Sequence, residues 1–228
     1  MRVRFPLSAP YPQKRENVIR LAVKVPTDIA VAVSGGCDSM SALEFLRLGG
    51  RKVEALYFDH GTPHGSDARE WIKEYCENRK IQLTVGSISS SKPRGESEEA
   101  WWRKERYSFL EEASQGREVV LGHHLDDAIE NWIMTSIRGN PEVIPPRRGR
   151  FIRPLLLTRK ESIKSWARSR GVPWIEDPSN AVDVHDRNFV RNSIVPQAFR
   201  LNPGLDKVVR KKIELLRGLE AADDGRKA

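Results

Sequence analysis

The chain has 228 residues, of which 39% are hydrophobic and 31% are charged, and this length suffices for one substantial core or for one core with a small appendage. No segment approaches the roughly eighteen consecutive apolar residues of a membrane span, and the first residues contain no apolar stretch of signal-peptide length. The two cysteines, Cys37 and Cys76, are too few for a disulfide framework and lack a Cys-x-x-Cys spacing. We therefore expect a cytoplasmic protein without a membrane partner.

Positive charge is concentrated in one part of the chain. The formal net charge is +8, and residues 147–170 contain nine basic side chains against one acidic side chain. A second basic cluster near the end consists of Arg200, Lys207, Arg210, Lys211 and Lys212. Single lysines and arginines usually belong to solvated helix faces. Their concentration in one segment favours contacts with phosphates, either of a nucleic acid or of a nucleotide.

Apolar runs and helical periodicities alternate along the chain. In chain order, the sequence predicts a helix over 11–24, a strand over 29–33, a helix from Met40 to a stop at Gly49-Gly50, a strand over 53–58, a helix over 66–80, a strand over 83–88, an aromatic-rich helix over 98–114, a short strand over 119–122, a helix over 126–138, a last strand over 151–156, a helix from a cap at Thr158 to Arg170, and two helices near 187–199 and 205–219.

This alternation is typical of βαβ units, so we expect an α/β fold with a parallel, roughly five-stranded sheet and helices on both faces. We place the main domain at residues 1–182 and a short helical C-terminal extension at residues 183–228. Ligands of such sheets bind at the carboxyl ends of the strands. Three polar clusters follow predicted strands and should meet at that edge, at residues 34–36, 59–60 and 123–124.

The first of these clusters continues into the next helix as Ser34-Gly35-Gly36-Cys37-Asp38-Ser39. A loop that enters a helix N-terminus presents unpaired backbone N–H groups and the positive end of the helix dipole, and glycines let a phosphate come close. No lysine follows the second glycine and no Gly-x-Gly-x-x-Gly is present, which excludes the P-loop and the dinucleotide turn. We interpret the segment as a phosphate-binding loop, although a plain turn between strand and helix uses the same residue types.

The second dense cluster is Gly122-His123-His124-Leu125-Asp126-Asp127-Ala128-Ile129-Glu130. Asp126 is expected to cap the following helix, and the spacing places Asp127 and Glu130 on one helical face. Two carboxylates close to a phosphate loop suit Mg²⁺, although Asp126 and Asp127 could equally serve only the helix N-terminus while His123 packs. A zinc site built from His60, His64, His123 or Cys76 is disfavoured because His60 and His64 lack a helical frame.

The pattern Ser-Gly-Gly-x-Asp-Ser after an apolar strand resembles the PP-loop of the N-type ATP pyrophosphatases, which cleave ATP between the α and β phosphates. Further motifs follow it in register: Asp59-His60-Gly61, Glu99-Ala100-Trp101-Trp102-Arg103-Lys104-Glu105-Arg106-Tyr107, the His-His-x-Asp-Asp cluster with Glu130, Arg138-Gly139, Arg153-Pro154-Leu155-Leu156, Trp174-Ile175-Glu176-Asp177-Pro178-Ser179-Asn180 and Arg187-Asn188-Phe189-Val190-Arg191. In this order, from about residue 29 to residue 196, they resemble the N-terminal catalytic domain of the tRNA(Ile)-lysidine synthetase family.

The resemblance implies an adenine nucleotide α-hydrolase-like fold for residues 1–182 and a ligase reaction in two steps. ATP adenylates the C2 carbonyl oxygen of the wobble cytidine of isoleucine tRNA. The amine of free L-lysine then attacks that carbon, which releases AMP and leaves lysidine. ATP, Mg²⁺, tRNA and lysine are the implied ligands.

The resemblance also implies roles for individual residues. ATP is expected to contact Ser34, Gly35, Gly36, Cys37, Asp38, Ser39, Asp59, His60 and Gly122. Catalysis is assigned to Asp38, Arg103, His123, His124 and Asp127, with Asp38 and Asp127 as the Mg²⁺ ligands. Substrate binding is assigned to Arg103, Arg106, Asp127, Glu130, Arg153, Arg187 and Arg191. The attacking amine must lose a proton, and the sequence does not choose between His123 and His124 as the acceptor. Trp101 and Trp102 could stack on a base, but core packing is favoured.

The chain departs from the family pattern at several positions. Ala128 and Asn131 stand where family members tend to have Gln and Thr, and Thr62-Pro63-His64 replaces a segment that usually contains Leu-Arg. Longer members carry C-terminal tRNA-binding domains, whereas this chain stops at Ala228. We therefore expect a short form whose basic segments suffice for tRNA, or else a different substrate.

Three alternative functions remain open from the sequence. A tRNA cytidine 2-thiolation enzyme of the same superfamily is disfavoured by the missing Cys-x-x-Cys, because that chemistry requires several thiolates. A non-catalytic tRNA-binding protein on a PP-loop scaffold would not need Asp38 and the carboxylates at 126, 127 and 130. A synthetase that acts on a small molecule would leave the basic segment 147–170 without a purpose.

Overall fold

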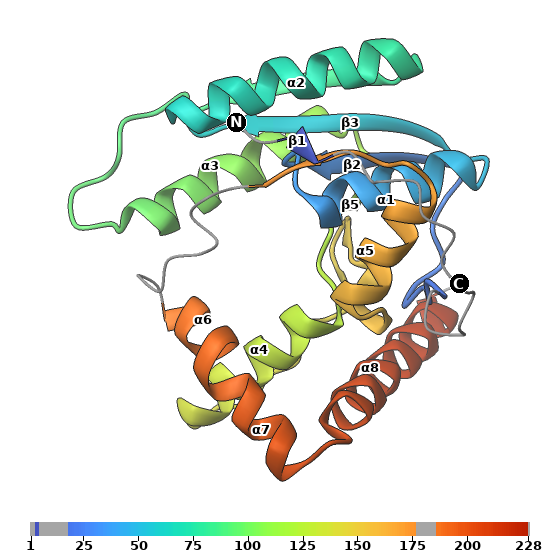
Figure 1. Ribbon diagram of the computed structural model, residues 1–228, viewed down its shortest axis with the longest axis vertical. Helices are drawn as coiled ribbons and strands as arrows, with labels where there is room; N and C mark the ends of the chain where they lie inside the picture. Colours follow the sequence, from blue (N-terminus) through green and yellow to red (C-terminus); the bar gives the residue numbers. More distant parts are fainter. Residues whose placement is uncertain (1–2, 5–17, 177–185, 228) are drawn as a thin grey trace.

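The computed structural model describes residues 3–4, 18–176 and 186–227 (Figure 1). Its centre is a six-stranded sheet with the strand order β4-β3-β2-β5-β7-β6. Five strands pair in parallel: β2 (Asp28–Val33), β3 (Lys52–Asp59), β4 (Gln82–Ser87), β5 (Val119–Val120) and β7 (Phe151–Ile152). The expected parallel α/β sheet is confirmed, and within this sheet the sequence missed β6 (Arg147–Arg148), an antiparallel edge strand on β7.

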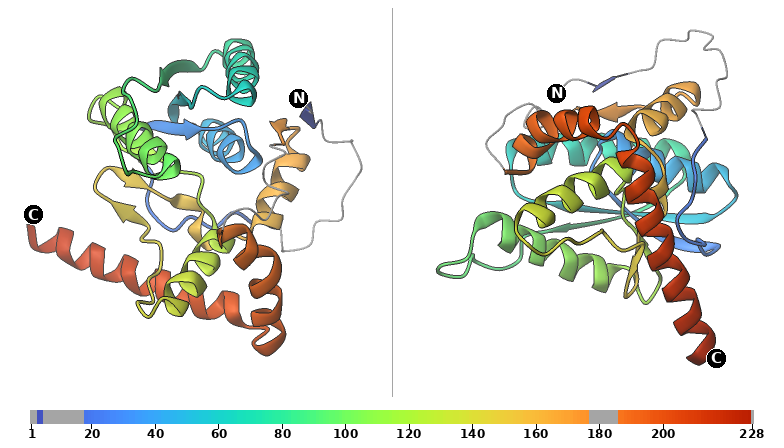
Figure 2. Two further views of the ribbon diagram at one scale, coloured as in Figure 1. Left: turned by 90° about the vertical axis from the view of Figure 1, so that its left-hand side faces the viewer. Right: turned by 90° about the horizontal axis from the view of Figure 1, so that it is seen from below.

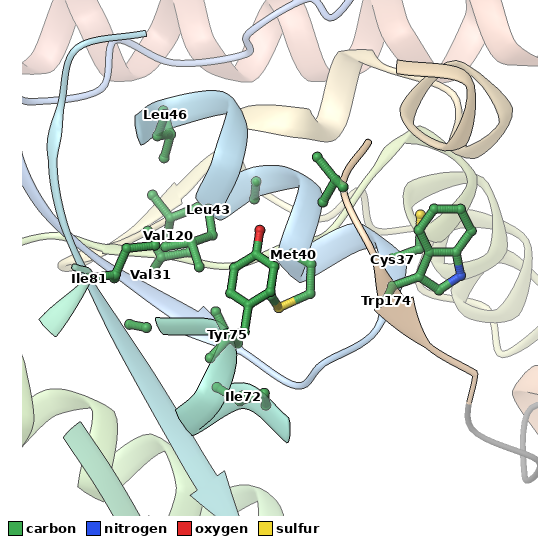
Figure 3. Close-up of a cluster of buried hydrophobic side chains, with 14 of the residues drawn as sticks. Val31, Cys37, Met40, Leu43, Leu46, Ile72, Tyr75, Ile81, Val120 and Trp174 are labelled. Atoms are coloured by element: carbon green, nitrogen blue, oxygen red, sulfur yellow. The ribbon is translucent and has the colours of Figure 1, made fainter. Parts of the chain in front are cut away.

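Helices cover both faces of this sheet, as Figure 2 shows. One face carries α1 (Cys37–Leu48), α2 (Pro63–Arg79) and α5 (Lys160–Ser169), and the other carries α3 (Glu98–Ala113). The alternation of side chains along β2 explains this arrangement. Ile29, Val31 and Val33 enter the larger core with α1 and α2, whereas Ala30 enters the smaller core under α3. Figure 3 shows side chains of α1, α2 and the strands gathered in the larger core.

The remaining helices pack below the sheet around a separate apolar core (Figure 1). They are α4 (Leu125–Ile137), the 3-10 helix η2 (Pro154–Leu157), the π-helix η4 (Val190–Ile194), α7 (Val195–Leu201) and α8 (Leu205–Lys227). The short helix α6 (Asp186–Phe189) leads into η4 and has no residue in this core. Ile129 of α4 and Val209 of α8 are fully buried in this core. The domain boundary expected at residue 182 lies outside the described residues, and the division into domain and extension stays a prediction.

Three local expectations were wrong. The helix over 11–24 does not form at residues 18–24, and residues 11–17 lie outside the described part of the chain. The strand over 151–156 ends at Ile152, because Pro154 cannot donate to a ladder and starts η2. Thr158 does not cap α5, since its hydroxyl donates to the carbonyl of Arg20 and accepts from the amide of Arg20, each at 2.9 Å.

A small antiparallel sheet joins β1 (Val3–Arg4) to β8 (Trp174–Ile175), next to the loop that follows β2. Among the described helices, none combines the length and the apolar character needed to cross a bilayer.

Candidate functional site

The loop between β2 and α1 exposes the first amides of a helix. Gly36 is the N-cap residue of α1 and has no side chain to occupy those amides. Gly35 has φ +81°, and a Cβ there would lie 2.9 Å from the Ile175 side chain, so glycine is required. Ser39 Oγ accepts from the amide of Ser34 (3.0 Å) and donates to the carbonyl of Gly36 (3.1 Å). These two hydrogen bonds within the loop fix its conformation, and its amides remain available to an anion.

Gly122 brings the end of β5 against this loop. A Cβ at Gly122 would lie 3.1 Å from the Ser39 amide nitrogen and 3.2 Å from the Asp38 carbonyl carbon, both backbone atoms. A side chain at Gly122 would require these backbone atoms to shift by a few tenths of an ångström. As a result, His123 and His124 leave the sheet directly beside the start of α1.

His124 is almost fully buried and caps α4. Its Nδ1 lies 3.3 Å from the Asp127 amide, and the Asp127 carboxylate accepts from the His124 amide at 2.9 Å, which completes a capping box. Its Nε2 lies 3.6 Å from Asp38 Oδ2. Burial lowers the pKa of His124, but the carboxylates of Asp127, Asp38 and Asp126 outweigh burial and raise the pKa above its usual value. Because Nδ1 accepts from the Asp127 amide, the ring proton in this arrangement is on Nε2, which faces Asp38.

Asp38 is held as a carboxylate. Lys160 Nζ lies 3.2 Å from Asp38 Oδ2, on the same oxygen that faces His124. Burial alone would raise the pKa of Asp38, but the hydrogen bond and charge of His124 and the charge of Lys160 lower the pKa to about 2. The other oxygen, Oδ1, is buried and has no hydrogen-bond partner among the described residues. That oxygen is available to a ligand.

Asp126 does not cap its own helix, which corrects the sequence-based expectation. Its Oδ2 accepts from the Lys160 amide at 2.7 Å, and its Oδ1 lies 2.9 Å from Arg159 Nη2. Asp126 thus caps α5 and fastens the start of α5 beside Asp38. Arg159 and Lys160 were not predicted as site residues. The only signal was their membership of the basic segment 147–170.

Asp127 and Glu130 share one face of α4, as predicted, and together hold two arginines. Arg187 bridges them, with Nη2 at 2.8 Å from Asp127 and Nε at 2.9 Å from Glu130. Arg191 binds Glu130 through Nε at 2.6 Å and Nη2 at 3.0 Å. Burial opposes the charge of Asp127, yet the charges of His124 and Arg187 lower its pKa. This carboxylate pair is a preformed site for cations.

The other side of the edge contains His60, Trp102, Arg106 and His123. Burial lowers the pKa of His123 to about 4, because the nearby charges of Arg153, Arg187 and Arg106 offset the opposing effect of Asp127. Its Nδ1 is buried and has no partner in the described part of the chain. Burial and the charge of Arg106 also lower the pKa of His60, whose ring centroid lies 5.3 Å from that of Trp102. Both histidines are therefore neutral near pH 7.

Arg103, Arg106 and Arg153 form what we call the arginine cluster. No carboxylate of residues 3–4, 18–176 or 186–227 pairs with any of them. Arg153 is only 4% exposed, donates through Nη1 to the carbonyl of Pro145 at 3.1 Å, and leaves its Nε without a partner. Arg103 is exposed and lies over the Tyr107 ring at 4.9 Å.

Some predicted residues contribute less directly. The Cys37 side chain points into the larger core (Figure 3), where burial raises its pKa to about 11, so only its backbone belongs to the loop. Asp59 is buried and accepts from the Gly61 amide at 2.8 Å, which shapes the turn after β3. Trp101 and Trp102 belong to no buried apolar cluster of the described residues, so the favoured core interpretation was wrong for both.

Two positions that depart from the family pattern have structural roles. Ala128 is fully buried in the core shared by α4 and α8. Asn131 donates to the carbonyl of Glu142 at 3.0 Å. Both residues therefore support α4 and its following loop.

Three kinds of known protein resemble this chain. A model of the PP-loop domain family matches residues 11–198. A tRNA(Ile)-lysidine synthase of Thermotoga sp. is 33% identical over 202 residues, which is 82% of this chain and 49% of that protein. The enzyme of the same name from Vibrio parahaemolyticus is 30% identical over 226 residues, which is 93% of this chain and 52% of that protein. The chain thus spans about half the length of these curated relatives.

An NMN synthetase from Francisella tularensis has a similar fold, with a TM-score of 0.50 and 14% identity over 84% of this chain and 87% of that chain. At that identity the likeness concerns the fold alone. The match over residues 11–198 includes β2, the loop 34–39 and the cluster 122–130, which are the elements that build the site described above. The chain therefore belongs to the PP-loop domain family.

Proposed function

We propose that this chain ligates free L-lysine to C2 of the wobble cytidine of isoleucine tRNA, through an adenylated tRNA intermediate and with release of AMP and pyrophosphate. One observation carries the proposal. A phosphate-type loop with the ionised Asp38 and a cation-binding pair, Asp127 and Glu130, meet at one sheet edge and are joined through His124. The names of the relatives supply the tRNA and the lysidine product.

The loop 34–39 is proposed to hold the phosphates of ATP. Its support is the row of uncapped amides at the start of α1, the close approach of Gly122, and the ammonium group of Lys160 beside Asp38. Lys160 supplies from α5 the positive charge that a P-loop lysine would supply from the loop itself. Asp59 and His60, at the end of the neighbouring strand β3, are the proposed contacts for the rest of the nucleotide.

The residues present fit a magnesium ion at Asp38 better than at Asp127. Asp38 Oδ1 is buried without a partner, whereas both oxygens of Asp127 already accept hydrogen bonds. No group of three or more His, Cys, Asp or Glu side chains among the described residues could hold a metal ion without other ligands. This suits Mg²⁺, which usually binds one or two carboxylates together with phosphate oxygens. When bound, the ion would neutralise charge on the phosphates of ATP.

Lysine is proposed to bind through its ammonium group to Asp127 and Glu130. Arg187 and Arg191 now place guanidinium groups on the same oxygens, so they stand in for a cationic substrate. Glu130 is buried, whereas the side chains of both arginines are partly exposed and can move away. Lysine binding is therefore expected to exchange one cation for another rather than to bury an unpaired charge.

The two histidines suit different steps. A proton acceptor must be neutral before it acts, and His123 is neutral with an unpartnered Nδ1. We assign the proton of the attacking amine to His123. His124 offers an Nε2–H donor beside Asp38, where negative charge develops on the phosphate side. Arg103 is proposed to offset negative charge as a second cation, close to the bound tRNA.

Thiol chemistry is disfavoured by both cysteines. Cys37 and Cys76 are buried, and burial raises the pKa of each to about 11. Thiols with such pKa values are almost entirely protonated at neutral pH, and the thiolate is the reactive form. A 2-thiolation enzyme of the same fold would need a thiolate from another source.

The test is nucleoside analysis of isoleucine tRNA with a wobble cytidine after incubation with the chain, ATP and labelled lysine. The expected result is labelled lysidine together with released pyrophosphate, and no product without ATP. Thiocytidine would assign the 2-thiolation function instead. Unmodified cytidine without pyrophosphate release, under conditions in which the chain still binds tRNA, would identify a non-catalytic tRNA-binding protein. Asp38→Asn is the matched inactive control.

A further inference from the structure

Within the part of the chain that the structure describes, Arg106 and Arg153 have no carboxylate partner, unlike several other arginines. Arg47 and Arg79 bind Glu44, Arg117 binds Glu54, and Arg187 and Arg191 bind Glu130. Arg153 is more deeply buried than any of these five, yet its side-chain hydrogen bonds go to the Pro145 carbonyl and to the Tyr107 side chain, and to no carboxylate of the described residues. A buried cation without a counter-charge is costly unless an anion completes the site.

The two arginines approach the sheet edge from different elements. Arg153 directly follows β7, whose parallel neighbour β5 leads into His123. Arg106 precedes Tyr107 on α3, and the Tyr107 ring packs edge-on against Phe151 of β7, with centroids 4.9 Å apart. The charges of both arginines also act on His123, which follows the end of β5.

Arg106 belongs to α3, which covers one face of the sheet, whereas α1 and its N-terminal loop lie on the opposite face (Figure 2). The loop already has the helix amides and Lys160 as its cations and donors for ATP phosphates. An anion that satisfies Arg106 and Arg153 therefore has to be a different group. A guanidinium suits a phosphate because its planar donors match two phosphate oxygens.

We propose that Arg106 and Arg153 form a second phosphate-binding site, separate from the loop 34–39, that takes a phosphodiester of the RNA strand beside the reacting nucleotide. The inference rests on the proposed function, because it assumes that RNA reaches this edge. Exposed Arg103 and Arg148 flank the site and extend the positive surface outward. The charge of Arg106 also acts on His60, whose ring lies at a tilted angle to that of Trp102 with centroids 5.3 Å apart.

The test compares Arg106→Gln with Arg51→Gln in tRNA filter binding at several salt concentrations and in calorimetric binding of a non-hydrolysable ATP analogue. Arg51 is the matched control because it is also half-buried, also has an unpartnered Nε, and lies before β3 at the opposite edge of the sheet. We expect Arg106→Gln to weaken tRNA binding about tenfold and to reduce the salt slope by about 0.7 to 0.9, the loss of one phosphate contact. Binding of the ATP analogue should not change. Arg106→Lys should restore much of the tRNA affinity.

Arg153→Lys is the second variant, since replacing a buried arginine by a neutral residue risks the fold. This variant keeps the positive charge but removes the planar guanidinium with its paired donors. It should weaken tRNA binding less than Arg106→Gln does. A loss confined to the ATP analogue would overturn the assignment to RNA. Unchanged affinity for both ligands in a folded Arg106→Gln variant would overturn the site altogether. Wild-type chain that binds tRNA but makes no lysidine would contradict the proposed reaction and leave this comparison intact.

Discussion

His123 and His124 are neighbours in the chain, yet they face two regions of opposite character. Three carboxylates surround His124 and raise its pKa, whereas burial and three arginines around His123 lower its pKa to about 4. One peptide bond at the end of β5 thus separates an acidic region, in which most charges already have partners, from an arginine region, in which Arg106 and Arg153 have no carboxylate partner among the described residues. Environments that give two similar groups different pKa values are typical of sites that need an acid and a base.

The contrast predicts how each region responds to ligands. In the acidic region, Asp127 and Glu130 must release Arg187 or Arg191 before another cation can bind. In the arginine region, a phosphate adds partners without displacing any carboxylate. A cation that binds in the acidic region should therefore replace an arginine and gain only a modest net affinity. A phosphate that binds in the arginine region should gain affinity directly from the positive charges there.

The largest expected effect comes from breaking the acidic region at Asp127. Asp127→Asn removes a charge that is proposed to hold the lysine ammonium, and kcat/KM for lysine should fall by about 10²- to 10³-fold. Pyrophosphate release that depends on ATP and tRNA should fall much less. Glu161→Gln, at an exposed position of α5, is the control and should leave both unchanged. An equal loss of both activities would move Asp127 from the lysine side to the ATP side.

Asp38 should make the stability of the protein sensitive to acid. Its pKa in the folded chain, about 2, is below the ordinary 3.8, so its stabilising contribution is present above pH 3.8 and is lost as the pH falls through 2. The difference corresponds to about 2 kcal/mol of unfolding free energy. Urea unfolding of wild type and Asp38→Asn at a series of pH values should give curves that converge toward pH 2. Parallel curves would show that His124 and Lys160 do not stabilise the carboxylate.

A smaller effect is expected at Asp126, which joins the two helices that frame the acidic region. Asp126→Ala removes the cap of α5 and should lower the unfolding free energy by about 1 kcal/mol. Because the start of α5 carries Lys160, the same change should also weaken binding of an ATP analogue, which calorimetry can measure. Asp126→Asn keeps an acceptor oxygen and should be milder in both assays. Loss of stability with unchanged nucleotide binding would separate Lys160 from the nucleotide.

The smallest expected effect concerns the arginine region. Arg106→Gln removes one of the charges that lower the pKa of His123 and of His60, so both pKa values should rise, by less than about one unit. An NMR titration of the imidazole protons would follow both rings. The pKa of His124 should not move, because Arg106 is not among the groups that act on it. A rise at His124 as well would show that the two regions are not electrically separate.

The sequence predicted what depends on short spacings. The loop 34–39, the pairing of Asp127 with Glu130 and the position of the polar clusters at strand ends follow from local geometry, and all were found at one edge. Three contacts between residues far apart in the chain were not predicted. Asp126 caps α5 instead of its own helix, Lys160 contacts Asp38 over 122 positions, and Arg187 binds Glu130 over 57 positions. These contacts depend on the angle at which α5 and α6 return to the sheet, which no local pattern encodes.

The false helix at residues 18–24 has a related cause. Val18, Leu21 and Ala22 have helical spacing, but the Ala22 amide is taken by the carbonyl of Pro154 at 2.7 Å and the Ala22 side chain fills the core under α4. A tertiary contact with the opposite part of the chain thus overrides the local periodicity. The same contact explains why Thr158 bonds to Arg20 rather than to its own helix.

Gly122 has a mechanical consequence. A Cβ would come within 3.2 Å of backbone atoms at Asp38 and Ser39, so no layer of side chains separates the end of β5 from the start of α1. Contacts between backbones do not deform as side chains do. When the amides of the loop take up a phosphate, we therefore expect any shift of the loop to move His123 and His124 as well. The nucleotide and the two histidines would then report each other's state without any moving lid.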